Sequence, residues 1–425
     1  MDLISYPSKQ EWPHLIKRPL RDWGSLEKQV VPIFDEVRRN GDAALKALTQ
    51  KFDGVAIENI AVSPQEFEQA QKGVDKELKD AIAAAAENIR NFHENQYVNE
   101  DAIETVEGVK CWRKSVAIEK VGLYIPGGSA PLFSTVLMLA IPAVIAACDE
   151  IVLCTPPDKE GKIHSAILYA ASVAGVKKVF KVGGAQAIAA LTLGTQSVPR
   201  VDKLFGPGNQ YVTIAKQIAQ RYGTVIDMPA GPSEVLVMAD KTGNPAFIAA
   251  DLLSQAEHGK DSHVIFLTTD ELLLNKTMNE LQKQLAVLPR KEIAEVAIAN
   301  SKALLLRSLD EMTAFSNLYA PEHLIIMVEQ LEKAAESVKN AGSVFLGPYT
   351  PEAAGDYASG TNHTLPTNGY ARNYSGLSLD DFMKKITFQK ISAAGIKNIG
   401  NIIETMAEAE QLTAHKNAVS LRMND

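Results

Sequence analysis

Two of the eight histidines in this chain follow directly on a glutamate, and a third lies in a glycine-rich polar stretch. The pairs are Glu257-His258, in Ser-Gln-Ala-Glu-His-Gly, and Glu322-His323, in Ala-Pro-Glu-His-Leu; the third histidine is His363. Imidazole transfers protons near neutral pH and binds transition metals, and a neighbouring carboxylate tunes either role. We therefore expect the chemistry of the protein in these segments.

The first pair suggests a metal site. Gln255 and His258 are three residues apart on a segment expected to be helical, so their side chains share a face. With Asp356 they would form a mixed nitrogen and oxygen set that zinc, manganese or cobalt accepts. The alternative is that His258 only ends a helix before a capping Gly259. Spacing leaves both interpretations open.

The second pair could work as a base and a water activator held side by side. The alternative places Glu322 in an N-cap region after Pro321, where its charge favours the helix dipole. His363 is expected in a loop, where binding groups concentrate. His415, five residues after Glu410, is by itself typical of a solvated helix position.

Two cysteines could be nucleophiles that trap an aldehyde, but no activating histidine is near Cys111 or Cys154 in the sequence, so buried thiols are favoured. The three cysteines show neither a CxxC spacing nor a dense, even pattern. This usage indicates a reducing compartment. We expect a cytoplasmic protein, because the N-terminus also lacks a basic start followed by an apolar run.

The elements that must position these residues begin with a helical N-terminal third. Helices are expected over residues 25–39 and 43–52, and Ser63, Pro64 and Glu66 supply an N-cap, a first-turn proline and a capping box for a long helix towards Asn95. The apolar stretch 133–148 is too short to span a membrane and is expected to be a buried helix.

From Val121 onward, short apolar runs alternate with helical stretches, which is typical of a parallel sheet covered on both faces. We expect two α/β units in tandem with a boundary near residues 231–233. The expected strands are 150–154, 176–182, 203–205, 224–228, 234–238, 263–267, 324–328 and 343–346. The last 50 or so residues are mostly helical and too few to bury a core alone, so they should pack on another domain or subunit.

Glycine and proline loops end several of these strands, at residues 126–128, 183–184, 206–208 and 229–232. In open α/β sheets ligands bind beyond the carboxyl ends of the strands, and a following helix N-terminus favours an anion such as a dinucleotide phosphate. Each loop alone could be an ordinary tight turn. The GxGxxG fingerprint is absent, so spacing does not identify NAD.

Composition excludes some classes of function. The 425 residues should divide into two or more domains, and 46% hydrophobic with 22% charged residues is typical of a globular protein. A formal charge of -8 gives no electrostatic footprint for nucleic acid, and no segment is expected to cross a membrane.

Six motifs occurring in order make the sequence from about residue 20 to 420 resemble histidinol dehydrogenase. They are Val182-Gly-Gly-Ala-Gln-Ala-Ile-Ala-Ala-Leu191, Phe205-Gly-Pro-Gly-Asn209, Asp227-Met-Pro-Ala-Gly-Pro-Ser-Glu234, Ser254-Gln-Ala-Glu-His-Gly259, Ala320-Pro-Glu-His-Leu324 and the stretch from Gly355 to Pro366. The resemblance implies oxidation of L-histidinol through an aldehyde to L-histidine, with two NAD reduced and one water consumed.

The resemblance also implies roles for individual residues. The implied ligands of one zinc ion per subunit are Gln255, His258, Asp356 and His415, which would also hold the substrate. The other implied substrate-contacting residues are Ser233, His323, His363 and Glu410, and the NAD site would be lined by Tyr124, Gln186 and Asn209. His323 would accept the alcohol proton and Glu322 would activate water.

The family fold is two incomplete Rossmann-like domains with small terminal helical segments. We expect an N-terminal segment 1–21, a first Rossmann-like domain 22–123 plus 234–372, a second one 124–233, and a C-terminal helical domain 373–425 that reaches the partner's active site in a homodimer. Two alternatives remain. One is a metal-dependent hydrolase or lyase on the same α/β scaffold, which would use the histidine and carboxylate groups without NAD. The other is a non-catalytic two-domain small-molecule binding protein that closes about a hinge.

Overall fold

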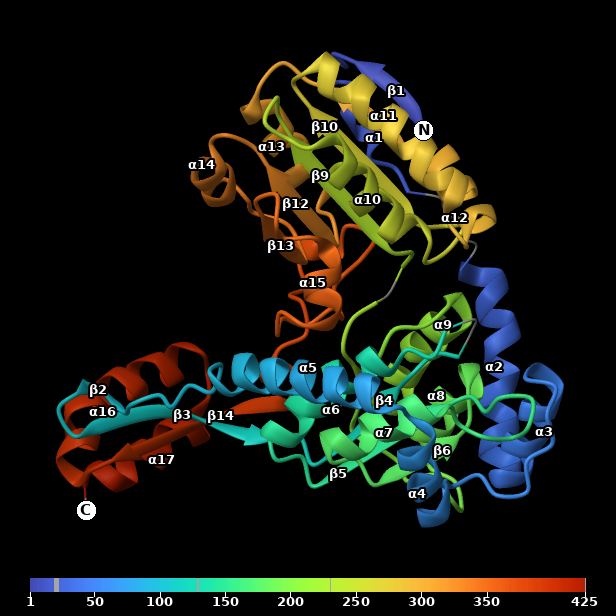
Figure 1. Cartoon of the computed structure of the whole chain (residues 1–425). Coiled ribbons are helices and arrows are strands. Elements are labelled where there is room, and N and C mark those ends of the chain that lie inside the picture. The colour runs from blue at the N-terminus through green and yellow to red at the C-terminus, as the bar shows by residue number, and fades with distance from the viewer. Residues whose placement is uncertain (19–22, 128–129, 230, 425) are drawn as a thin grey trace.

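The computed structural model describes residues 1–18, 23–127, 130–229 and 231–424. Two α/β bodies lie one above the other, and an arm extends sideways from the lower one (Figure 1). Each body is built on a parallel sheet, so the predicted α/β class is confirmed. Among the described residues, no helix is both long and apolar enough to cross a membrane.

The upper body contains a sheet of strand order β1-β11-β10-β9-β12-β13, in which all neighbours are parallel. Successive residues of β9 alternate between two apolar cores: Val235 and Val237 pack with one, Leu236 and Met238 with the other. Because both faces are covered, its strands are continuously apolar. The strands are β1 Asp2–Ser5, β11 Lys302–Leu305, β10 His263–Thr268, β9 Glu234–Ala239, β12 His323–Met327 and β13 Ser343–Leu346.

Helices cover both faces of this sheet. One face packs against α10, α11 and α12, and the other against α1, α13 and α14, while α15 lies at the end nearest the lower body (Figure 1). The helices are α1 Trp12–Leu15, α10 Pro245–Ala256, α11 Glu271–Val287, α12 Lys291–Ala299, α13 Leu309–Tyr319, α14 Leu331–Glu336 and α15 Glu352–Tyr357.

The lower body repeats the plan with the parallel strand order β6-β5-β4-β7-β8. Its strands are β4 Lys120–Tyr124, β5 Glu150–Thr155, β6 Lys178–Lys181, β7 Lys203–Phe205 and β8 Val225–Ile226. Its helices are α2 Trp23–Asn40, α3 Asp42–Phe52, α4 Pro64–Gly73, α5 Lys76–Glu94, α6 Phe133–Ile145, α7 Ser165–Ala174, α8 Gly184–Leu193 and α9 Gln210–Ala219.

The division into bodies differs from the expected domains. Helices α2 to α5 pack on the lower sheet, with α2 against α8 and α9, α4 against α7, and α5 against α6. Residues 23–94 therefore belong with 124–233 and not, as expected, with 234–372. In addition, β1 of the expected N-terminal helical segment joins the upper sheet beside β11. The amphipathic pattern of a helix shows which side is buried but not which sheet covers it.

One expected helix is two helices. Ser63 and Glu66 form the predicted capping box at the start of α4, and Pro64 occupies its first turn. The helix ends at Gly73, and Asp75 caps a new helix, α5, by accepting a hydrogen bond from the Leu78 amide. A second N-cap inside the predicted span explains why the chain changes direction there.

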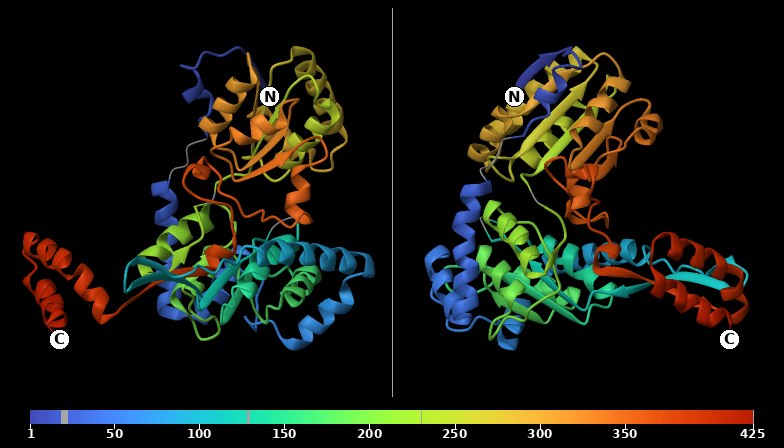
Figure 2. Two further views of the ribbon diagram at one scale, coloured as in Figure 1. Left: turned by 90° about the vertical axis from the view of Figure 1, so that its left-hand side faces the viewer. Right: turned by 180° about the vertical axis from the view of Figure 1, so that it is seen from behind.

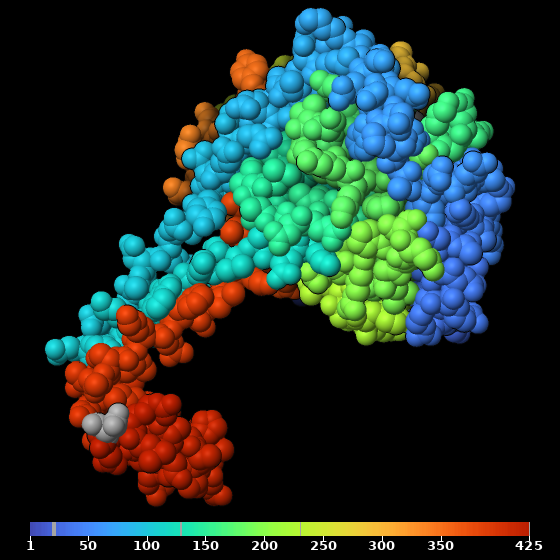
Figure 3. Space-filling model, turned by 90° about the horizontal axis from the view of Figure 1, so that it is seen from below, coloured from blue at the N-terminus to red at the C-terminus, as the bar shows by residue number. Residues whose placement is uncertain are grey.

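The arm comprises residues 103–117 and 383–424. Strands β2 Ile103–Val106, β3 Val109–Ala117 and β14 Met383–Ile391 form an antiparallel sheet, and the helices are α16 Ala393–Ala409 and α17 Thr413–Met423. The C-terminus lies at its far end (Figure 2). From below, the arm curves away and leaves an open space beside the lower body (Figure 3). The predicted C-terminal helices are present, but β14 pairs with a strand far away in sequence.

Candidate functional site

The residues singled out in the upper body meet at a cavity between the two bodies. This cavity of about 330 Å³ is lined from above by Ser233, Gln255, His258, Glu322, His323, Asp356 and His363. The lower body contributes loop residues that include Pro126, Gly206, Pro207, Gly208 and Asn209. Three of the four predicted glycine and proline loops thus contribute described residues to this cavity, and the fourth, at 183–184, lines the second cavity through Gly184. Gly128 and Ala230 of the predicted loops lie outside the described residues.

Helix α10 delivers Gln255 and His258. Asn244 caps its start by accepting a hydrogen bond from the Ala246 amide, and Gln255 lies in its last turn with 1% of its surface exposed. The Gln255 amide Nε2 donates to Oε2 of Glu322 at 3.3 Å, while its Oε1 has no hydrogen-bond partner among the described residues. His258 follows the helix end and is exposed. A buried amide oxygen without a donor is suited to face a cation.

Glu322 directly precedes strand β12 and His323 begins it, so the alternative of a helix N-cap for Glu322 is wrong. Oε2 of Glu322 accepts a hydrogen bond from the Glu234 backbone N–H at 2.7 Å, and His323 Nδ1 donates to the Glu234 carbonyl at 3.1 Å. Because a carbonyl only accepts, this contact places the proton on Nδ1. In the neutral tautomer, Nε2 of His323 then carries the free lone pair, and it has no hydrogen-bond partner among the described residues.

The short helix α15 places a carboxylate opposite this imidazole. Oδ1 of Asp356 lies 3.7 Å from Nε2 of His323 and 4.0 Å from Nδ1 of His363. His363 is itself held by two contacts: its Nδ1 donates to the Asp356 carbonyl at 3.0 Å, and its Nε2 lies 3.2 Å from Oγ1 of Thr135. Since Thr135 belongs to α6, His363 connects the two bodies at the cavity.

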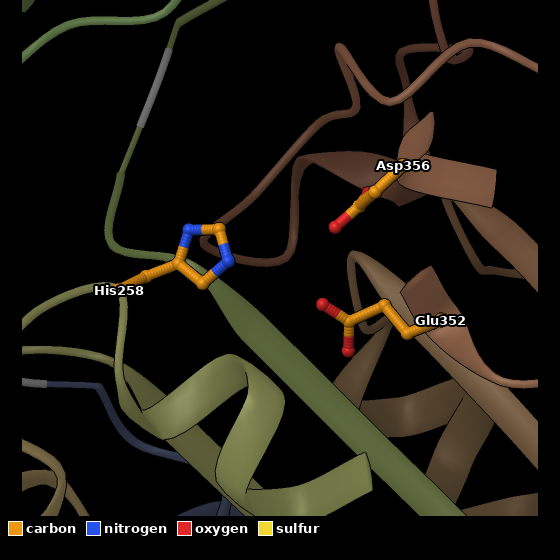
Figure 4. Close-up of side chains that lie close together, drawn as sticks. All are labelled: His258, Glu352 and Asp356. Atoms are coloured by element: carbon orange, nitrogen blue, oxygen red, sulfur yellow. The ribbon is translucent and has the colours of Figure 1, made fainter. Parts of the chain in front are cut away.

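The structure adds Glu352, which the sequence interpretation missed. One turn before Asp356 on α15, it is 1% exposed, and neither carboxylate oxygen has a hydrogen-bond partner among the described residues. Ligand atoms of His258, Glu352 and Asp356 all lie within 4.8 Å of one another (Figure 4). The available signal was the spacing of four between two acids, which puts both on one helix face.

Ionisation in this cluster reflects its negative charge. Burial alone would lower the pKa of His323, but the carboxylates of Glu352 and Glu322 outweigh it and hold that pKa well above its usual value. Burial raises the pKa of Glu352, whereas the nearby His323 outweighs burial and lowers the pKa of Asp356. Burial lowers the pKa of His363. The cavity therefore holds several acidic side chains close together, and their negative charges repel one another unless a positive charge lies nearby.

These residues fit a divalent metal ion. A free amide oxygen on Gln255, an imidazole on His258 and a carboxylate on Asp356 form the mixed nitrogen and oxygen set that zinc accepts. A cation there would also offset the negative charge that raises the pKa of His323. Two buried oxygens of Glu352 without donors point the same way, since buried charges are normally paired or coordinate a metal.

Two predicted residues are not brought to the cavity within one chain. Glu410 ends α16 and His415 lies in the first turn of α17, and both side chains are exposed on the arm. In both views of Figure 2 the helices at the C-terminus stand at the far end of the arm, away from the two α/β bodies. Neither residue is among the described residues that line the two cavities of the chain.

The residues predicted to line an NAD site surround a second cavity, of about 910 Å³, in the lower body. Tyr124, Gln186 and Asn209 all line it, and Asn209 also lines the first cavity. The Gly184 amide donates to the Tyr124 hydroxyl at 3.0 Å, and Nε2 of Gln186 is buried without a hydrogen-bond partner among the described residues. Asn209 has a structural role as well, because its Oδ1 caps α9.

None of the three cysteines is among the described residues that line the two cavities. Cys154 is fully buried in β5, and burial raises the pKa of its thiol far above the usual value. Cys111 lies in β3, on the arm. The predicted burial is confirmed for Cys154 but is wrong for Cys111, which is only partly buried.

Comparisons with known proteins agree along the whole chain. The family described as histidinol dehydrogenase matches residues 16–423. A histidinol dehydrogenase of Bacteroides thetaiotaomicron is 58% identical over 424 residues, covering 100% of this chain and 99% of that protein. One of Bacteroides fragilis is 56% identical, with 100% and 99% covered. The crystal structure of histidinol dehydrogenase from Elizabethkingia anophelis superposes with a TM-score of 0.98 at 57% identity, covering 100% of this chain and 98% of that one.

Proposed function

This chain belongs to the histidinol dehydrogenase family, and we propose that it oxidises L-histidinol through L-histidinaldehyde to L-histidine with two molecules of NAD. It is a dehydrogenase of histidine biosynthesis. The observation that best supports the four-electron reaction is the joint binding of Glu322 and His323 by one backbone residue, Glu234, at the cavity. A base and a water activator are thereby held next to each other.

In the first oxidation, neutral His323 accepts the hydroxyl proton of histidinol at Nε2 while hydride leaves the carbinol carbon for NAD. The hydrogen bond from Nδ1 to the Glu234 carbonyl supports this role, because it leaves Nε2 free and directed to the cavity. The products of this step are the aldehyde and NADH.

In the second oxidation, the Glu322 carboxylate takes a proton from water, and the hydroxide oxygen bonds to the aldehyde carbon. The resulting hydrate anion loses hydride to a second NAD and gives the carboxylic acid, which releases its proton to water and leaves the carboxylate of histidine. The Glu234 amide and Gln255 amide both bind Oε2 of Glu322, which leaves Oε1 available for the water. This geometry suits a general base that must stay ionised.

We also propose one Zn²⁺ per subunit, held by Gln255, His258 and Asp356 and by His415 of the partner subunit. When bound, the ion would orient the substrate through its imidazole and amino nitrogens. Ser233, His363 and Glu410 of the partner subunit would complete the substrate contacts, and Tyr124, Gln186 and Asn209 would line the NAD site. The cavities that these residues line support the assignment.

A homodimer follows from the same assignment. The arm carries exposed apolar side chains on both helices, including Ile402 at 59%, Met406 at 59% and Leu421 at 74% exposure. Apolar side chains gathered on a small projecting element favour association with another surface. A partner chain that covers the arm would also bring His415 to a cavity.

Absorbance at 340 nm with histidinol and NAD tests the proposal. We expect two NADH per histidinol consumed and histidine as the product. One NADH per histidinol would contradict the four-electron reaction, and no NADH would leave a metal-dependent hydrolase or lyase as the competing assignment.

A further inference from the structure

We propose that Arg18 is a positioning residue for catalysis, which acts on Glu322 and His323 through Glu234. The inference rests on the proposed function in one respect only, the roles given to Glu322 and His323. Neither Arg18 nor Glu234 is among the described residues that line the cavity, so neither is placed to touch the substrate. Their effect on the reaction has to pass through the residues that they hold.

Glu234 holds both catalytic groups with its backbone. Its N–H donates to Oε2 of Glu322 at 2.7 Å, and its carbonyl accepts from Nδ1 of His323 at 3.1 Å. It is the first residue of β9, the strand that pairs with β12 where His323 begins. A shift of this one peptide would move the carboxylate and the imidazole together.

Arg18 fixes the Glu234 side chain by a two-point contact. Its Nε lies 2.6 Å from Oε1 and its Nη2 lies 2.7 Å from Oε2, and the Asn368 amide donates to Oε1 at 3.0 Å. The Glu234 side chain is fully buried and that of Arg18 is 9% exposed. Such a bidentate pair sets direction as well as distance.

Arg18 is itself firmly held. Its Nη2 donates to the Tyr319 carbonyl at 3.0 Å, and its guanidinium carbon lies 3.8 Å above the centre of the Tyr319 ring. Tyr319 is completely buried at the end of α13. The chain therefore uses a residue 216 positions away in sequence from Glu234 to fix the start of β9.

The ion pair between Arg18 and Glu234 is needed to keep the start of β9 in place, because Glu234 is a buried acid close to another buried acid. Burial, and to a lesser extent the neighbouring carboxylate of Glu322, raises the pKa of Glu234, while Arg18 opposes both effects. Without the guanidinium, the Glu234 carboxylate would be buried and unpaired, which is strongly destabilising. The strand start would relax towards solvent or the side chain would take up a proton, and either change moves the Glu234 peptide.

The test compares turnover with substrate binding. We expect Arg18→Met to lower kcat for histidinol roughly 10- to 100-fold, the scale of a misplaced catalytic group. KM should change less than about threefold, because the residues that bind histidinol are unaltered. Arg18→Lys keeps the charge but loses the fork, so it should fold like the parent and recover only part of kcat.

A matched control separates positioning from stability. Lys181 forms another ion pair of low exposure, with Glu66, in the lower body and lines neither cavity among the described residues. We expect Lys181→Met to lower the Tm but to leave kcat near the parental value below the Tm. A parental kcat in both Arg18 variants would overturn the inference, as would parallel losses of kcat in the Arg18 and Lys181 variants of equal Tm.

The positioning role of Arg18 can be tested even if the protein does not oxidise histidinol. If the parent protein reduces no NAD with histidinol, the proposed function has failed, and crystal structures of the parent and Arg18→Lys decide the inference instead. We expect the contacts from Glu234 to Glu322 and His323 to lengthen in the variant. Unchanged positions of both side chains would overturn it. If Arg18→Met does not fold, Arg18→Lys carries the kinetic test alone, with parental kcat as the contradicting result.

Discussion

Nε2 of Gln255 lies 3.3 Å from Oε2 of Glu322, so a single buried amide connects the proposed metal site with the proposed water activator. The amide donates with its nitrogen and keeps its oxygen free. Glutamine can do both, whereas an ionised glutamate has no hydrogen to donate. The choice of an amide at this position therefore avoids a second carboxylate next to Glu322.

Replacing Glu322 by Gln should separate the two half-reactions. Glutamine cannot take a proton from water, so we expect oxidation of histidinaldehyde to fall about 10²- to 10³-fold, while oxidation of histidinol falls within about tenfold. Rapid-mixing measurements of NADH formation from each substrate provide the comparison. Equal losses in both half-reactions would contradict the division of labour between Glu322 and His323.

Gln255→Glu changes only one group in the side chain and should also act through Glu322. Two carboxylates at this distance repel each other, so we expect the variant to lose more than about tenfold in kcat for the aldehyde. Its metal content, measured by atomic absorption after dialysis, should stay at one ion per subunit because a carboxylate is an equally good ligand. Loss of the metal with loss of activity would mean that the amide serves the ion alone.

Removing the metal should abolish activity. Because the ligands must be deprotonated to bind, chelation at mildly acid pH should be efficient, and Zn²⁺ should restore turnover at neutral pH. Glu352→Gln should weaken Zn²⁺ binding roughly 10- to 100-fold, since it replaces a buried carboxyl group, which can ionise when the cation binds, within 4.8 Å of ligand atoms of His258 and Asp356. Isothermal titration of the metal-free proteins measures this, with Glu336→Gln, on α14, as the control. Full turnover after verified metal removal would exclude the zinc assignment.

Much of the fold around this site could be predicted from the sequence, because short apolar runs that end in glycine or proline are a strong local signal for buried strands. Strands such as β7, whose observed bounds match the expected 203–205, are short apolar runs closed by glycine and proline. The buried helix α6 was predicted from its apolar run in the same way. Loops at the carboxyl ends of parallel strands meet at one edge, so the predicted cleft is where the cavities lie.

The rest depends on tertiary contacts that leave no local signal. The partners β3 and β14 pair across about 270 residues, with Trp112 stacked on Phe388, and their mixed polar and apolar residues resemble those of a loop. Glu352 has the same residue type as a surface acid, and only its packing shows that it is buried. Likewise, nothing near Arg18 in the sequence indicates its contact with Glu234.

Stability should depend on pH through His263, away from the cavity. Burial, and secondarily the charges of Lys302 and Arg18, lowers its pKa to about 3, and its Nδ1 lies 2.7 Å from the Tyr319 hydroxyl. The unfolded chain binds this proton below about pH 6.5, whereas the folded chain does not, so stability is lost as pH falls from there towards 3. We expect the stability difference between parent and His263→Gln to shrink by about 1.4 kcal/mol per pH unit between pH 6 and 5.

Urea unfolding in the presence of a chelator measures this difference without a contribution from metal binding. His14→Gln, at an exposed position on α1, is the control and should show no such trend. A difference between the parent and His263→Gln that does not vary with pH would show that His263 titrates normally in the folded chain.

If each active site takes residues from both subunits, two inactive variants should restore activity to each other in a mixed dimer. His258 lies at the cavity and His415 on the arm, so His258→Ala and His415→Ala should each be inactive as homodimers. A mixed dimer of the two would contain one site with both losses and one site with neither. After co-refolding in equal amounts, half of the dimers should be mixed and half of their sites intact, which restores about a quarter of the parental activity. Mixing without exchange of subunits should restore none, and sizing by light scattering verifies that the species are dimers. If the co-refolded mixture stays inactive while mixed dimers are present, His415 does not serve the partner's site, and its role would have to lie within the arm.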